Sequence, residues 1–283
     1  MLLGSHLRRL RESRGITREK AGYSIRASES KISRMELGRV SFKTRDVEDL
    51  LTLYGIADDA ERNSLLSLAK EANVAGWWHS YSDVLPSWFP TYVGLEGAAS
   101  LIRSYEVQFV HGLLQTEAYA HAVVERGMRS ANHGKGAKAV SAADIDRRVA
   151  LRLERQKYLV SENAPDFHVV LDEAALRRPY GDREVMRGQL QHLIDVSQRP
   201  NVRLQIMPFG FGGHAGESGA FTVLSFPESD LSDVVYLEQL TSALYLDKRE
   251  DVTQYEKAMK QLQDDSPGPD ESRDLLRGLL QLS

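Results

Sequence analysis

Residues 17–39, TREKAGYSIRASESKISRMELGR, constrain the fold more than any other stretch of this 283-residue chain. Two short helices that cross steeply need a small residue where they approach and apolar residues on both inner faces. Gly22 occupies the small position. The apolar positions are Ile25, Ile32, Met35 and Leu37. The spacing therefore predicts two short helices that share one core.

Start and stop signals accompany both helices. Thr17 can cap the first helix and Ser28 the second, and an acidic residue in each opening turn suits the helix dipole. Gly38 is a C-terminal stop signal, so we expect the second helix over residues 28–37.

Apolar residues at helical spacing predict three further helices around this pair. They lie at Leu3, Leu7 and Leu10, at Val47, Leu50, Leu51 and Tyr54, and over residues 58–71. The five-helix segment resembles the DNA-binding domain of the lambda-repressor/Cro-like regulators, the XRE family. The resemblance implies a helix-turn-helix domain, here over residues 1–72, whose second motif helix enters the DNA major groove.

Two positions depart from the pattern of that family. Arg26 stands where the turn usually has Gly, and Arg18 stands where the first motif helix usually has Gln. A residue with a side chain costs about 1 kcal/mol in the left-handed conformation, so we expect a strained or reshaped turn at Arg26.

The charge distribution favours DNA as the ligand of this segment. Residues 1–45 hold 12 Lys and Arg against 4 Asp and Glu, whereas the rest of the chain holds 24 against 36. A basic head on an acidic body concentrates phosphate attraction where the motif lies.

Position within the motif suggests a role for each polar residue. The exposed N-terminal part of the second helix faces base edges, and flanking residues meet phosphates. The candidates for reading bases are Glu29, Ser30 and Ser33, with Ser28 at the helix start, and Lys31 and Arg34 suit either task. The candidates for phosphate contact are Arg18, Arg26, Arg39 and Lys43. By the family resemblance, Glu36 pairs with Arg8 or Arg11 instead of touching DNA.

Residues 73–92 form an aromatic-rich bridge that contains Trp77, Trp78 and Trp88. A segment this apolar is not a flexible linker, so we expect it to pack against the second domain. It is either structural packing or a surface for a partner or ligand.

The pattern of residues 93–283 predicts a mixed α+β domain, which makes the whole chain a two-domain α+β protein. We expect a helix through Leu95, Ala98, Ala99, Ile102 and Tyr105, and others over residues 142–159, 182–197, 249–264 and 269–282. The expected strands are residues 167–171, 202–207, 220–226 and 234–237.

Three stretches carry a second resemblance: LEGAASLIRSYEVQFVHGLLQTEAYAHAV, LDEAALRRPYGDREVMRGQLQHLIDVSQRPNVRLQIMPF and GAFTVLSFPESDLSDVVYLE. They are similar to the C-terminal domain of a large actinobacterial group of XRE regulators. That resemblance implies an antitoxin-like regulator with a small protein partner encoded nearby. His111 departs from it, because the group usually has Pro before Gly112. The change predicts a more mobile loop or an added polar contact.

The enzymatic interpretations are weaker than the regulatory one. The glycine-rich loop over residues 210–219 lacks the Lys-Ser/Thr ending of a phosphate-binding loop and precedes a strand. His214 and Glu217 have no second His or Cys ligand at a fitting distance, and no nucleophile-base pair is apparent. We therefore expect no catalytic residue, metal or cofactor, and treat His111 and His214 as part of a possible partner or ligand surface with the tryptophans.

The sequence as a whole predicts a cytoplasmic regulator. It has no cysteine, no apolar stretch of membrane-spanning length and no export signal. We expect a homodimer on a near-palindromic double-stranded operator. Three hypotheses for the second domain remain: it receives a small protein, it holds a small-molecule pocket, or it is an enzyme with a DNA-binding head.

Overall fold

A computed structural model describes residues 2–36, 38, 40–74, 76–131, 141–227 and 231–282. The chain divides into two units. One comprises Met1–His79 with Pro227–Ser232, and the other comprises Ser80–Phe226 with Asp233–Ser283. Leu37 and Arg39, both named in the sequence analysis, lie outside the described residues.

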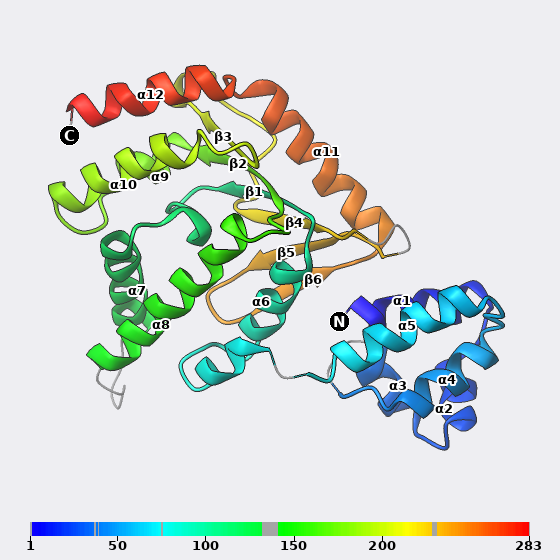
Figure 1. The fold of residues 1–283 in the computed structure, drawn as a ribbon. Helices are drawn as coiled ribbons and strands as arrows, with labels where there is room; N and C mark the ends of the chain where they lie inside the picture. Colours follow the sequence, from blue (N-terminus) through cyan, green and yellow to red (C-terminus); the bar gives the residue numbers. More distant parts are fainter. Residues whose placement is uncertain are drawn as a thin grey trace. The chain divides into compact units, whose positions relative to one another are not determined.

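The described part of the first unit contains the five expected α-helices (Figure 1). They are α1 (Leu2–Ser13), α2 (Arg18–Ser24), α3 (Glu29–Glu36), α4 (Thr44–Leu53) and α5 (Asp59–Glu71). Their core buries the apolar residues expected from helical spacing, among them Leu7 of α1, Ile32 and Met35 of α3, and Leu51 and Tyr54 at α4. The prediction of an all-α N-terminal domain is confirmed.

The described residues of the second unit form a sheet of six strands in the order β3-β2-β1-β4-β5-β6. The strands are β1 (Leu101–Glu106), β2 (Asp166–Asp172), β3 (Val202–Met207), β4 (Phe221–Ser225), β5 (Val234–Glu238) and β6 (Ala243–Leu246). Strands β1, β2 and β3 run parallel to one another, whereas β4, β5 and β6 pair antiparallel with their neighbours.

Helices, labelled in Figure 1, and short 3-10 turns precede, connect or follow these strands along the chain. They are η1 (Trp77–Tyr81), α6 (Phe89–Ala98), η2 (Gly112–Leu114), α7 (Glu117–Ala131), α8 (Ala142–Gln156), η3 (Lys157–Val160), α9 (Glu173–Arg177), α10 (Arg183–Val196), η4 (Phe209–Phe211), α11 (Arg249–Asp265) and α12 (Pro269–Leu282). Helix α11 packs across one face of the sheet through Val252, Met259 and Leu262. Helices α7 and α8 pair through a core of their own, and α12 lies against α10 and β3.

One expected helix is wrong in its second half. Leu95 and Ala98 do lie on a helix, α6, but the chain becomes extended at Ala99, and Ile102 and Tyr105 belong to β1. Apolar residues three apart fit either element in so short a stretch, and pairing of β1 with both β2 and β4 decides for the strand. Strand β6 was not expected from the sequence at all. The mixed α+β class of the second domain is nevertheless confirmed.

Candidate nucleic-acid interface

Helices α2 and α3 approach each other across the turn formed by residues 25–28, and Gly22 permits that approach. A Cβ atom on Gly22 would lie 2.7 Å from the carbonyl oxygen of Ala27, a distance that real Cβ atoms do not reach. Ile25 and Ile32 are buried between the helices. The small residue thus stands where the motif needs it.

The caps of both helices are those expected from the sequence. The Thr17 hydroxyl accepts a hydrogen bond from the Lys20 amide at 3.2 Å, and the Ser28 hydroxyl accepts one from the Lys31 amide, also at 3.2 Å. Each bond satisfies an amide that the first turn of a helix leaves without a partner. Both capping predictions are confirmed.

Arg26 adopts the left-handed conformation, with φ of 53°, and it alone does so among the described residues other than glycine. Its side chain is exposed. The backbone strain expected at this turn is therefore present. The guanidinium of Arg26 lies on the surface at the turn between the two motif helices.

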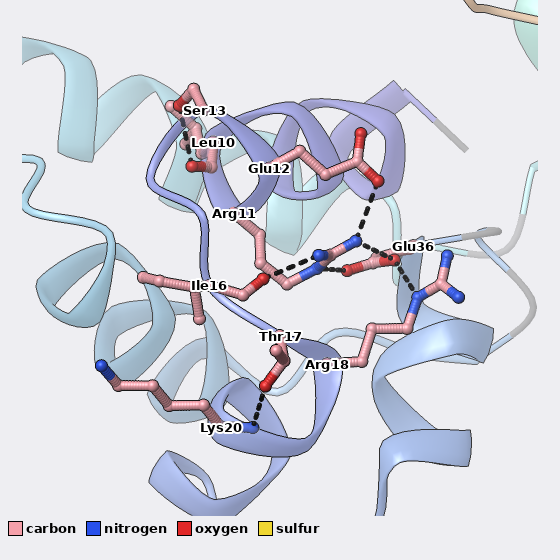
Figure 2. A network of polar contacts seen from close by, with 9 residues as sticks. All are labelled: Leu10, Arg11, Glu12, Ser13, Ile16, Thr17, Arg18, Lys20 and Glu36. Atoms are coloured by element: carbon pink, nitrogen blue, oxygen red, sulfur yellow. Dashed lines mark hydrogen bonds and ion pairs between the residues drawn. The ribbon is translucent and has the colours of Figure 1, made fainter.

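Figure 2 shows a network of ion pairs that joins α1, α2 and α3. Arg11 donates from Nε to Glu36 Oε1 at 2.5 Å, and Arg18 donates from Nε to Glu36 Oε2 at 2.8 Å. Arg11 also donates to the carbonyl of Ile16 at 2.8 Å and to Glu12 at 3.0 Å. The buried Glu36 carboxylate raises the pKa of Arg11. Pairing of Glu36 with Arg11 was one of the two expected arrangements.

Helix α3 exposes part of the polar set that we expect at DNA. Glu29, Ser30 and Arg34 are exposed and Ser33 is half-buried. Arg34 donates from Nε to the Ser30 carbonyl at 3.3 Å, which lays its side chain along the helix.

Two basic candidates are already engaged within the head. Lys31 pairs with Asp46 at 2.6 Å, and the Nε atom of Arg18 is taken by Glu36 although the Arg18 side chain remains 39% exposed. Lys43 is exposed at the residue that precedes α4. The structure thus leaves Lys43, Arg26 and Arg34 as the exposed cations among the described candidates.

Two exposed residues beside these were not singled out from the sequence. Tyr23, near the end of α2, is 87% exposed, and Arg45 is exposed in the first turn of α4 next to Lys43. A single aromatic among polar neighbours on a short helix was the signal for Tyr23, and a second basic residue in the same turn as Lys43 was the signal for Arg45.

The aromatic bridge contributes partly exposed rings. Trp77 is 38% exposed and meets Trp78 edge to face, with 6.0 Å between ring centroids. Trp88 is half-buried, and its carbonyl oxygen accepts a hydrogen bond from the Tyr245 hydroxyl at 2.7 Å. In the described part of the chain, the buried indole N–H of Trp88 has no acceptor.

His111 is buried in the second unit, so it contributes nothing to an exposed partner surface, contrary to our expectation. Its Nδ1 accepts from the Leu113 amide at 3.2 Å, its Nε2 lies 3.3 Å from the Tyr92 hydroxyl, and its ring packs on Phe167. Burial lowers the pKa of His111 to about 4. Of the two expected effects of replacing Pro, the structure has the added polar contact.

His214 closes the glycine-rich loop onto the sheet. Its Nδ1 accepts from the Gly216 amide at 3.1 Å, and its Nε2 lies 3.6 Å from a carboxylate oxygen of Asp172. Gly216 packs against the ring of Tyr105, where a Cβ would lie 2.3 Å from a ring carbon. Within the described ranges, no three His, Cys, Asp or Glu residues are grouped so that they could hold a metal ion.

Comparison with protein families assigns both parts of the chain. Residues 2–65 match a helix-turn-helix domain, and residues 89–278 match a domain of unknown function, DUF5753. The chain belongs to the DUF5753 family. Comparisons with curated proteins and with solved structures gave no match. None of the described helices is both long and apolar enough to cross a membrane.

The DUF5753 domain contains a buried ion pair between α6 and α8. Arg155 donates to both carboxylate oxygens of Glu96, at 2.6 and 2.7 Å, and lies over the rings of Phe89 and Tyr92. Both partners are almost fully buried, at 4% and 0% exposure. Removal of either partner of so enclosed a pair would leave an uncompensated buried charge.

Proposed function

We propose that this protein is a sequence-specific, DNA-binding transcriptional regulator of the antitoxin-like kind. The observation that carries the proposal is the geometry of α2 and α3, with Gly22 at their closest approach and caps at both starts. We assign residues 1–72 to DNA binding, 73–92 to the bridge and 93–283 to regulation. In this proposal the regulator acts in the cytoplasm.

The exposed side of α3 presents donors and acceptors suited to base edges in the major groove. Glu29 can accept a hydrogen bond from a cytosine amino group, and Ser30 and Ser33 can donate or accept. Arg26, Arg34 and Lys43 lie around these residues as exposed cations. Cations flanking a recognition helix neutralise phosphates and fix its register, so this arrangement supports specific rather than purely electrostatic binding.

We further propose that the DUF5753 domain receives a small protein partner. This part of the proposal rests on the resemblance of three long stretches to regulators encoded beside such a partner. A small-molecule input is the second candidate. The observation that favours it is a hollow lined by arginines on the second unit.

Footprinting of the full chain on the DNA upstream of its own gene tests both parts. We expect protection of a near-palindromic site, and we expect the small protein encoded nearby to release or strengthen that protection. The absence of any protected site at modest salt would contradict DNA-binding regulation at this locus. Protection unchanged by the small protein would reject it as the input.

A further inference from the structure

A hollow of about 610 Å³ opens on the second unit between one face of α7 and the loop that follows α9. Helix α7 contributes Ala122, Glu125, Arg126 and Arg129, which are spaced so that they share one side of the helix. The loop contributes residues 178–181. Hollows of this volume are the usual size of small-molecule sites.

The charges around this hollow do not balance. Arg129 pairs with Glu125 at 2.6 Å, which is the one carboxylate among the described lining residues. Arg178 is held by neutral acceptors, Gln108 Oε1 at 2.8 Å and the carbonyl of Val107 at 3.5 Å. The side chain of Arg126 makes no hydrogen bond or ion pair with any described residue. Two guanidinium groups therefore line one hollow without a carboxylate partner among the residues that the structure describes.

Residues that follow α7 in the sequence offer no compensating charge. Residues 132–140, NHGKGAKAV, contain two lysines and neither Asp nor Glu. An anion that satisfies Arg126 must therefore come from outside this part of the chain.

The loop wall of the hollow is held in place by packing. The Tyr180 ring meets Phe109 and Tyr119 edge to face, with centroids 6.2 and 5.6 Å apart. Gly181 follows with φ of 77°, a conformation that suits glycine, so the chain turns sharply there. Tyr180, Pro179 and Ala122 add a less polar surface beside the guanidinium groups. The hollow thus combines two guanidinium groups with an adjacent less polar surface.

We propose that this hollow binds a small organic anion whose phosphate or carboxylate groups bridge Arg126 and Arg178 while its body lies against Tyr180. Both anions match the planar fork of a guanidinium, which donates two parallel hydrogen bonds. The site is separate from the helix-turn-helix motif and does not depend on DNA binding.

Isothermal titration of the full chain tests the proposal with two probes and a neutral control. ADP carries a diphosphate together with a flat adenine ring, citrate carries three carboxylates, and adenosine carries the same ring without the charge. We expect saturable binding of ADP, of citrate or of both, and no binding of adenosine. The anion that binds more tightly shows whether the site prefers phosphate or carboxylate. Saturable binding of neither ADP nor citrate overturns the proposal.

Substitutions locate the site. We expect Arg126→Ala and Arg178→Ala each to weaken binding of the anion at least tenfold, with Arg126→Lys intermediate because the fork is lost while the charge is kept. Arg277→Ala is the matched control, since Arg277 is an exposed arginine of α12 paired with Asp274. The affinity of the Arg277→Ala variant for the anion should stay within twofold of that of the wild type. An equal loss in Arg277→Ala shows general charge attraction and overturns the proposal.

Two other results also contradict it. A hexaglutamate peptide that binds through the same arginines while ADP and citrate do not would make the hollow a protein-docking surface. Weaker DNA binding by Arg126→Ala and Arg178→Ala, measured without added anion, would make it a DNA contact. Circular dichroism of each variant confirms that it is folded. The absence of a DNA footprint would contradict DNA-binding regulation but would not affect the titration result. The proposal of anion binding is therefore tested independently of the proposed function.

Discussion

At the scale of single residues, substitutions in the head distinguish contact with phosphates from contact with bases. Lys43 is exposed just before α4 and forms no ion pair with any described residue, so we expect it to neutralise one phosphate. Lys43→Ala should weaken binding to all sequences alike and reduce the salt slope of log K by about one. Ser33→Ala should instead change the base preference and leave the slope unchanged.

Fluorescence anisotropy over a range of salt concentrations, on the operator and on unrelated duplexes, measures both effects. Lys70→Ala is the matched control, because Lys70 is an exposed lysine on α5, away from the motif in sequence. A salt slope unchanged in Lys43→Ala, or equally reduced in Lys70→Ala, contradicts the phosphate role of Lys43.

The second prediction concerns Glu106, a half-buried carboxyl at the end of β1. The pKa of Glu106 is raised to about 8, mainly by burial and also by repulsion from Glu238, while a 2.9 Å hydrogen bond from Ser104 and the positive charge of Arg155 oppose the shift. A carboxyl with a raised pKa in the folded state binds a proton on folding, so its contribution to stability falls as pH rises from about 4.5 to 8. Glu106→Gln removes that loss.

We expect Glu106→Gln to stabilise the protein relative to wild type by an amount that grows with pH, on the order of 1–3 kcal/mol at pH 8. Urea unfolding of both proteins at several pH values between 5 and 8.5 measures it. Glu154→Gln, at an exposed glutamate paired with Lys157, should change stability by less than about 1 kcal/mol at each pH. A difference that shrinks as pH rises would refute the raised pKa of Glu106.

At the scale of elements, local signals predicted helices well and strands less well. Thr17 and Ser28 cap their helices through bonds to amides three residues away, so the sequence nearby determines where α2 and α3 begin. Strand β1 depends instead on partners about 65 and 120 residues away, which no local pattern reveals. Strand β6 is an edge strand of only four residues, Ala243–Leu246, and so short an apolar run does not distinguish a strand from a helix.

In the candidate interface, too, the features set by local sequence were predictable and those set by tertiary contacts were not. Spacing predicted the position of Gly22, and the family resemblance implied the pairing of Glu36 with an arginine of α1. Neither predicted that Arg18 shares that carboxylate or that Lys31 pairs with Asp46, since both contacts depend on how the helices cross. The burial of His111 against Phe167 is likewise set by the fold of the sheet.

The prediction at this scale concerns the stability of the head when Gly22 is replaced. Alanine favours a helix by nearly 1 kcal/mol over glycine, but here its Cβ meets the backbone of Ala27, which cannot move without changing the turn. We expect Gly22→Ala to destabilise the head by roughly 1–3 kcal/mol, the usual cost of such overpacking.

Gly127 of α7 is the matched control for this substitution. A Cβ on Gly127 has no atom within 4 Å, so Gly127→Ala should stabilise its own helix by about 0.5–1 kcal/mol. Native-state hydrogen exchange reports the two units separately, through the amides of α3 and of α7. Unchanged or slower exchange in α3 of Gly22→Ala contradicts the close approach of the motif helices.

At the scale of the whole molecule, charge is unevenly distributed, with a net charge of +8 (12 minus 4) on residues 1–45 and of −12 (24 minus 36) on the rest of the chain. The basic first 45 residues draw the head to DNA, whereas the acidic remainder disfavours non-specific contact of the body with phosphates. We propose that a second head on the same DNA supplies part of the affinity of this regulator, because linking two binding modules makes the second binding event intramolecular.

We accordingly expect a homodimer that binds a near-palindromic operator with half-sites about 34 Å apart, one turn of the duplex. Linking two heads makes the second binding event intramolecular, so the full operator should bind about 10²- to 10⁴-fold more tightly than a single half-site. Sedimentation equilibrium of the free protein and titration of both duplexes at one salt concentration measure this. Moving the half-sites apart by five base pairs places them on opposite faces of the helix and should abolish the gain. A stable monomer that binds the full operator one to one, no more tightly than a half-site, would show that the regulator works as a single head.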